Sequence, residues 1–265
     1  MEIAEDKSRQ VGRRAEEVAE WYFRLNGFFL IPGFIVHPDL IKRTPRTEAD
    51  LLGIRLKHSK ESSWRSSGAN QHFSKIGRVD MTDDPIFNTA SFSEQSKKHL
   101  AVMVEVKAGE CAINGPWSPE HLNGNDTNVN NNMERALAKL GFGDASEVPL
   151  AAKSMYDQLR YEGSEFVVQY FAVGKAISTN LQEMYPKLKQ ITFDQIGTFL
   201  RYRFHGFPEK IPLDTNIKLW DGFGDIFARW FESRRQGSEP SNEICQMAVK
   251  SYIEKGSIDV RQVEV

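Results

Sequence analysis

A glutamate and a lysine stand two positions apart at the end of an apolar, β-branched run, Met103-Val104-Glu105-Val106-Lys107. In a β-strand the side chains alternate between two faces, so Glu105 and Lys107 would point the same way while the valines enter the opposite layer. A carboxylate holds a hard cation through oxygen, and a neighbouring lysine neutralises charge developing on a phosphate or orients a water. The pair therefore suits metal-assisted attack on a phosphodiester. The alternative is a surface ion pair on an edge strand, since E-x-K tripeptides are common.

Two other segments place a carboxylate next to an apolar surface. Residues 8–25 have the spacing of an amphipathic helix, on which Glu16 and Glu20 share a face close to the apolar stripe. The alternative for Glu16 is a solvent-facing position on that helix. Residues 49–56 alternate like a strand, and Asp50 lies on the face otherwise filled by Leu52, Ile54 and Leu56. A carboxylate on an apolar face is costly unless it is paired or binds a metal.

The order of a helix glutamate, a strand aspartate and a strand E-x-K pair resembles the PD-(D/E)XK nuclease superfamily, which has the restriction-endonuclease-like fold. Within it, the chain most resembles the Holliday-junction-resolvase-like branch. The resemblance covers about residues 8 to 110 and rests on Gly12, Glu16, Ala19, Gly27, Glu48-Ala49-Asp50-Leu51 and Val104-Glu105-Val106-Lys107. Gln158-Leu159-Arg160-Tyr161 resembles a glutamine motif that some members carry on the following helix, with the spacing to the tyrosine one residue short.

The chain departs from the family pattern at the aspartate, which no proline precedes. A literal Pro38-Asp39 lies upstream, and Asp80 and Asp84 follow in a polar segment, so three other aspartates compete with Asp50. We favour Asp50 because it alone lies within a convincing predicted strand.

The resemblance implies phosphodiester hydrolysis with Mg²⁺, for which Mn²⁺ would substitute. Asp50, Glu105 and the backbone carbonyl of Val106 would ligate the ion. Lys107 would stabilise developing charge, and Glu16 would bind a coordinated water or a second ion. The expected partner is nucleic acid, DNA in preference to RNA, and dimerisation is expected by resemblance only. The expected substrate contacts are basic and amide side chains near these motifs: Lys42, Arg43, Arg46, Arg14 and Gln158.

Composition limits the remaining function classes. The chain has 265 residues and a formal net charge of −2, so any nucleic-acid affinity must come from a local basic patch. Its two cysteines lie far apart without a Cys/His cluster, which argues against a zinc site or a disulfide framework and favours a reducing cytoplasm. The acidic N-terminus is unlike a signal peptide, and the longest apolar run, residues 28–36, is far shorter than the roughly 20 residues of a membrane-spanning helix.

The elements predict an α/β fold with mixed strand pairing. The resemblance implies a restriction-endonuclease-like core, with a mixed central sheet flanked by helices. We expect this core over residues 1–175, with a long insertion at about 57–98, and a mostly helical region over 176–265. The expected strands are 28–31, 34–36, 49–56, 100–106 and 165–173, and the expected helices are 8–25, 133–140, 149–162, 194–204, 220–231 and 241–254. The function expected is a DNA endonuclease of repair, restriction or anti-invader defence. The alternatives are a catalytically silent nucleic-acid-binding or partner-binding module, or an effector gated by its C-terminal helices.

Overall fold

The chain forms two compact units, each described here by itself. The computed structural model describes residues 2–36, 47–57, 98–114, 133–134, 136–138, 140–141, 146–205, 221–235 and 240–259. Among these residues, the helical unit contains those up to Asn26 and those from Phe193 onward, and the sheet unit contains 27–57 and 98–192. The N-terminal helix therefore groups with the C-terminal helices, and the spatial division differs from a boundary near residue 175.

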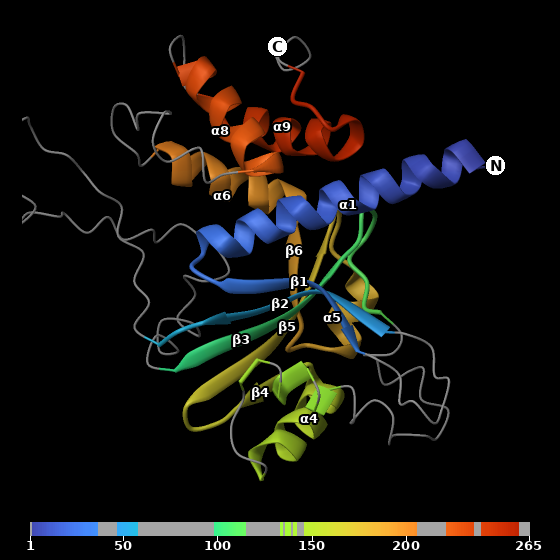
Figure 1. The fold of residues 1–265 in the computed structure, drawn as a ribbon, viewed down its shortest axis with the longest axis vertical. Coiled ribbons are helices and arrows are strands. Elements are labelled where there is room, and N and C mark those ends of the chain that lie inside the picture. Colours follow the sequence, from blue (N-terminus) through green and yellow to red (C-terminus); the bar gives the residue numbers. More distant parts are fainter. Residues whose placement is uncertain are drawn as a thin grey trace, which may run out of the picture. The chain divides into compact units, whose positions relative to one another are not determined.

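The sheet unit has a six-stranded mixed sheet (Figure 1). The first three strands form an antiparallel meander, and the third strand pairs in parallel with the fifth. The fourth strand pairs antiparallel with the fifth, and the sixth pairs with it in parallel. The strands are β1 (Phe29–Val36), β2 (Thr47–Arg55), β3 (His99–Val106), β4 (Arg160–Glu162), β5 (Phe166–Gly174) and β6 (Lys189–Thr192). The expected α/β class with a mixed sheet flanked by helices is confirmed.

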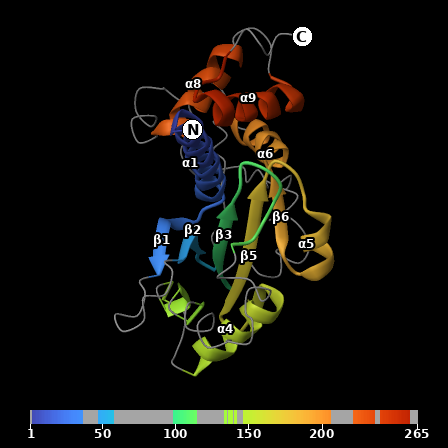
Figure 2. The ribbon, with the colours of Figure 1, turned by 90° about the vertical axis from the view of Figure 1, so that its right-hand side faces the viewer.

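The central strands β3 and β5 are buried along nearly their whole length. Such strands carry apolar side chains on both faces, which explains why their sequences read as continuous runs. One face packs under α4 (Glu147–Gln158), whose Ala151 and Met155 join Met103 in a single core cluster. The short helix α5 (Thr179–Met184) connects β5 to β6 (Figure 2). It adds partly buried side chains to the same cluster.

Three local features differ from the sequence-based expectation. Strand β1 runs through Pro32 and Gly33 without a break, because proline is tolerated on an edge strand and Gly33 takes a left-handed φ of 58°. The helix expected to reach residue 162 ends at Gln158, since Leu159 adopts φ 55° and the chain turns into β4. Strand β6 was not expected. Most of the predicted insertion at 57–98 lies outside the described residues.

The helical unit contains α1 (Glu2–Leu25), α6 (Phe193–His205), α8 (Gly222–Arg235) and α9 (Asn242–Lys255). Its aromatic side chains form a core, in which the rings of Phe223 and Tyr252 lie 4.9 Å apart. The carboxylate of Glu17 accepts hydrogen bonds from the Tyr252 hydroxyl at 2.5 Å and from the Phe223 N–H at 2.7 Å. These contacts tie α8 and α9 to α1.

Both cysteines are buried thiols that form no disulfide. Within the described part of the chain, no helix combines the length and apolar character needed to cross a membrane.

We predict that Gly174→Ala destabilises the protein by about 1–3 kcal/mol, because the added methyl group would overpack the end of β5. A Cβ at Gly174 would lie 2.7 Å from the Cys111 nitrogen and 2.8 Å from the Gly109 oxygen, both of them backbone atoms. Urea denaturation measures the change. Gly109→Ala is the matched control, since its Cβ meets nothing within 4 Å. Equal free energies of unfolding in the two variants would contradict the close packing at Gly174.

Candidate active site

The sheet brings Asp50 and Glu105 to neighbouring strands. Leu51 pairs with Val104 in the antiparallel ladder of β2 and β3, so the next step of this register places Asp50 opposite Glu105, on the same face. The Asp50 Oδ2 accepts a hydrogen bond of 2.6 Å from the backbone N–H of Val106. The two acids that the sequence singled out are therefore adjacent at the end of β3, with one of them held to the strand by a charge-assisted hydrogen bond.

Lys107 lies beside the glutamate. Its ammonium forms an ion pair with Oε1 of Glu105, whose side chain is 1% exposed while that of Lys107 is 42% exposed. The contact follows from strand alternation, because positions 105 and 107 share a face. The ion pair offsets the cost of burying a carboxylate, and the exposed part of Lys107 remains open to solvent.

The segment beyond Lys107 is fixed against the continuation of β5. The Lys107 N–H donates to the Val173 carbonyl at 2.9 Å, and the Lys175 N–H donates to the Gly109 carbonyl at 2.5 Å. A further bond runs from the Cys111 N–H to the Ala176 carbonyl at 2.8 Å. Backbone pairing therefore continues past the last residue of β3 and holds Lys107 beside Glu105.

Tyr170 is a neighbour of this site that the sequence did not reveal. It is buried on β5 opposite Met103, two positions from the Ala172 that pairs with Glu105. Desolvation raises the pKa of its hydroxyl well above the ordinary value, and the charges of Glu105 and Asp50 raise it further. Strand 165–173 was expected, but only the pairing of β3 with β5 places its tyrosine near the acids.

The donor atoms suit a hard divalent cation. Asp50 and Glu105 offer carboxylate oxygens, and the backbone carbonyl of Val106 is the third expected donor. Within the described residues, no group of three or more His, Cys, Asp or Glu side chains could hold a metal ion. Proteins nevertheless often bind Mg²⁺ through only one or two carboxylates, because the ion keeps several waters and takes further oxygen ligands from substrate phosphates. The residues present fit Mg²⁺ bound together with a substrate better than a closed metal site.

The structure places the other predicted site residues in the helical unit, at the end of α4, or outside the described residues. Glu16 is partly buried on α1, in the helical unit. Arg14, expected to contact nucleic acid, donates from Nη2 to the Glu254 carbonyl at 3.0 Å, where a cation stabilises the C-terminal end of α9. The remaining basic residues and the competing aspartates lie outside the described residues: Lys42, Arg43, Arg46, Asp39, Asp80 and Asp84.

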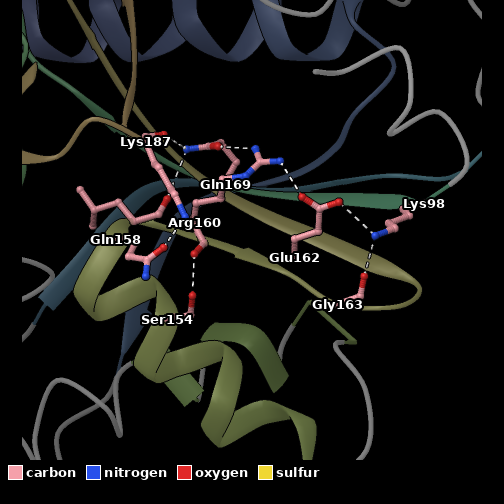
Figure 3. Close-up of polar contacts among 9 residues, drawn as sticks. Lys98, Ser154, Gln158, Arg160, Glu162, Gly163, Gln169 and Lys187 are labelled. Carbon is pink, nitrogen blue, oxygen red and sulfur yellow. Dashed lines mark hydrogen bonds and ion pairs between the residues drawn. The ribbon is translucent and has the colours of Figure 1, made fainter. Parts of the chain in front are cut away.

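Gln158 lies at the C-terminal end of α4 and is exposed. Figure 3 shows its Oε1 accepting a hydrogen bond from the Lys187 ammonium. The next residues form part of the same network, in which Arg160 donates to Gln169 at 2.9 Å and to Glu162 at 3.2 Å. The structure therefore gives Gln158 a contact with the turn before β6, and its expected contact with nucleic acid stays a prediction.

The buried Gln169 explains why this network exists. Strands β4 and β6 both pair with β5, one after the other along its length. The Gln169 amide donates to the carbonyls of Leu159, Tyr170 and Lys187 at 2.9 to 3.2 Å. It thereby adds hydrogen bonds to backbone acceptors at the point along β5 where β4 gives way to β6.

Comparison of the chain with protein-family models, with curated proteins and with solved structures finds no match. The function must therefore be argued from the motifs and from the geometry of the site itself.

We predict that Lys107→Met lowers the free energy of unfolding by about 1–3 kcal/mol, because the buried Glu105 carboxylate loses its neighbouring ammonium. Adding Glu105→Gln should restore most of the loss, since the charge is then removed. Urea denaturation of the two single variants and the double variant, all in EDTA, gives the coupling energy. Lys153→Met, an exposed lysine on α4, controls for the loss of surface charge. Strictly additive effects would contradict the ion pair.

We also predict that Glu162 stabilises the protein at neutral pH and loses this effect in acid. The hydrogen bond from Lys98 lowers the pKa of Glu162 below 4.5, with a further contribution from Arg160. A carboxyl group whose pKa is lower in the folded state stabilises the fold at pH values above its unfolded-state pKa. This stabilisation is lost as the pH falls through the folded-state pKa. At pH 7 the free energy of unfolding of wild type should exceed that of Glu162→Gln by less than about 1 kcal/mol, since the Glu162 side chain is 49% exposed. In acid the two free energies of unfolding should converge. Denaturation at several pH values, repeated in high salt to screen the pair, measures this.

Proposed function

We propose that this protein is a Mg²⁺-dependent nuclease that hydrolyses DNA phosphodiester bonds, an endonuclease of repair, restriction or anti-invader defence. The observation that carries the proposal is the placement of Asp50, Glu105 and Lys107. Two acids from neighbouring strands share one face of a mixed sheet, and a partly exposed ammonium is paired with the more buried acid. The resemblance of these motifs to the PD-(D/E)XK superfamily assigns the same three residues to catalysis.

Each of these residues has a distinct proposed task. The Asp50 carboxylate is oriented by the Val106 N–H, which leaves oxygen lone pairs for a cation. Glu105 supplies the second carboxylate from a buried position, where electrostatic interactions are strong. Lys107 is exposed enough for its ammonium to reach a phosphate oxygen and stabilise negative charge there. A bound Mg²⁺ would supply Lewis-acid polarisation of the phosphate and activation of a water.

The fold supports the same proposal. A restriction-endonuclease-like core is expected to have a mixed central sheet flanked by helices, with the aspartate and the E-x-K pair on adjacent strands. The sheet unit has the mixed sheet and the adjacent strands β2 and β3. Membership of that fold family remains part of the proposal, as does the role of Glu16.

DNA is the proposed substrate because the motifs resemble those of the PD-(D/E)XK nucleases. Since the net charge is −2, DNA binding would require a local rather than a global basic surface. Lys42, Arg43 and Arg46 directly precede β2, the strand that carries Asp50. Phosphate contacts from such a cluster would make binding dependent on salt but independent of base sequence.

We predict that the purified protein cleaves plasmid DNA with Mg²⁺ or Mn²⁺ and is inactive in EDTA. Asp50→Asn, Glu105→Gln and Lys107→Ala should each lower kcat by at least about 100-fold, the size expected for a preorganised electrostatic contact to the reacting group. Gel electrophoresis of the plasmid after timed incubation measures the rate.

The control variants are Asp157→Asn and Lys153→Ala, which change exposed residues of α4 and should cleave at the wild-type rate. If wild type binds DNA but converts no plasmid under any divalent metal, the catalytically silent binding module is favoured. Loss of activity in the controls as large as in the site variants would contradict the assigned roles.

A further inference from the structure

Tyr170 belongs to the same face of the sheet as the two acids. It pairs with Met103 on β3, and Ala172, two residues further along β5, pairs with Glu105. Side chains two residues apart on a strand point to the same face, so Tyr170 and Glu105 share it, and the register of β2 adds Asp50. Diagonal neighbours on adjacent strands lie within reach of a long aromatic side chain. The neighbouring strands β2, β3 and β5 therefore place two carboxylates and one phenol on the same face of the sheet.

Tyr170 is buried beside this region. The side chain is 2% exposed and lies in the core cluster with Met103 and Ala172. Both Glu105 and Asp50 interact with the hydroxyl through their charges, and the backbone N–H of Asn114 donates to its oxygen. A buried hydroxyl that accepts one hydrogen bond still has its own proton to donate.

The carboxylates of Glu105 and Asp50 are the charged groups that act on this hydroxyl. A carboxylate that accepts from a fixed donor has a defined orientation, and such outer partners of metal ligands typically change metal affinity when they are removed. A tyrosine on β5 can perform this task because its ring is held by core packing and because its oxygen is held by Asn114.

We propose that Tyr170 is a positioning residue, whose hydroxyl orients the Asp50 and Glu105 carboxylates, directly or through a water, for binding a divalent cation. This inference rests on the metal-binding part of the proposed function. It adds a residue that no sequence motif contains, and it assigns to β5 a share of the site otherwise built by β2 and β3.

The test is Mn²⁺ binding to the full chain, measured by isothermal titration calorimetry and by the electron paramagnetic resonance of free Mn²⁺. We expect Tyr170→Phe to weaken Mn²⁺ binding by about 10- to 100-fold, since the ring is kept and only the hydroxyl is lost. Raising the Mn²⁺ concentration should then restore kcat for DNA cleavage, and KM for DNA should be unchanged. If Tyr170 had only a structural role, a higher Mn²⁺ concentration would not restore kcat.

Tyr161→Phe is the matched control. Its hydroxyl also contacts a carboxylate, donating to Glu147 at 3.0 Å, but this contact joins β4 to α4 and involves neither Asp50 nor Glu105. We expect Tyr161→Phe to bind Mn²⁺ with the affinity of wild type. Circular dichroism confirms folding of each variant. If Tyr170→Phe does not fold, Asn114→Pro, which removes the N–H that holds the hydroxyl, should weaken Mn²⁺ binding in its place.

The outcomes separate the two proposals. Unchanged Mn²⁺ affinity in folded Tyr170→Phe, or in Asn114→Pro where that variant is needed, overturns the role of Tyr170, whatever the nuclease activity. Weakened binding in both Asp50→Asn and Tyr170→Phe, without DNA cleavage by wild type, supports Tyr170 and refutes the nuclease. Absence of Mn²⁺ binding by wild type, with or without DNA, overturns both.

Discussion

The burial of one carboxylate constrains the rest of the sheet unit. Glu105 is 1% exposed at the end of a strand that is otherwise apolar, and an ionised carboxylate in such a place is costly without a partner of opposite charge. Lys107 supplies that charge only while residues 105 to 107 stay extended, because alternation then puts both side chains on one face. Backbone pairing of Lys107 with Val173 preserves the extended chain. The site and the end of β3 therefore stabilise each other.

One face of the sheet carries both the packed core and the proposed site. Tyr170 belongs to the core cluster under α4, and the charges of Asp50 and Glu105 act on its hydroxyl. The rigid core thus positions the polar groups, as a binding or catalytic site requires. The close approach of Gly174 to the backbone of Cys111 brings the segment after Lys107 against β5.

In α1 the sequence predicted the buried face but not the long-range contacts of the polar side chains. Its apolar stripe correctly predicted the buried face, including Ala15, Val18, Ala19 and Tyr22. The motif drew attention to Glu16, but Glu17 makes the defined contacts inside the helical unit, with Tyr252 and the N-terminus of α8. No local pattern could indicate this, because the partners lie more than 200 positions away in the chain. Arg14 is similar, since its hydrogen bond to Glu254 depends on the packing of α9.

The sequence by itself determined the types and approximate limits of the long elements, because periodicity of apolar residues reflects burial directly. It also drew attention to Asp50, Glu105 and Lys107 as the proposed site, since a carboxylate on an apolar strand face needs a compensating partner. Only the tertiary structure decided that Asp50 lies opposite Glu105, that Tyr170 shares their face of the sheet, and that β6 joins the sheet. Strand order and register depend on pairing between distant segments, and residues 160–162 became β4 because the turn at Leu159 brought them to β5.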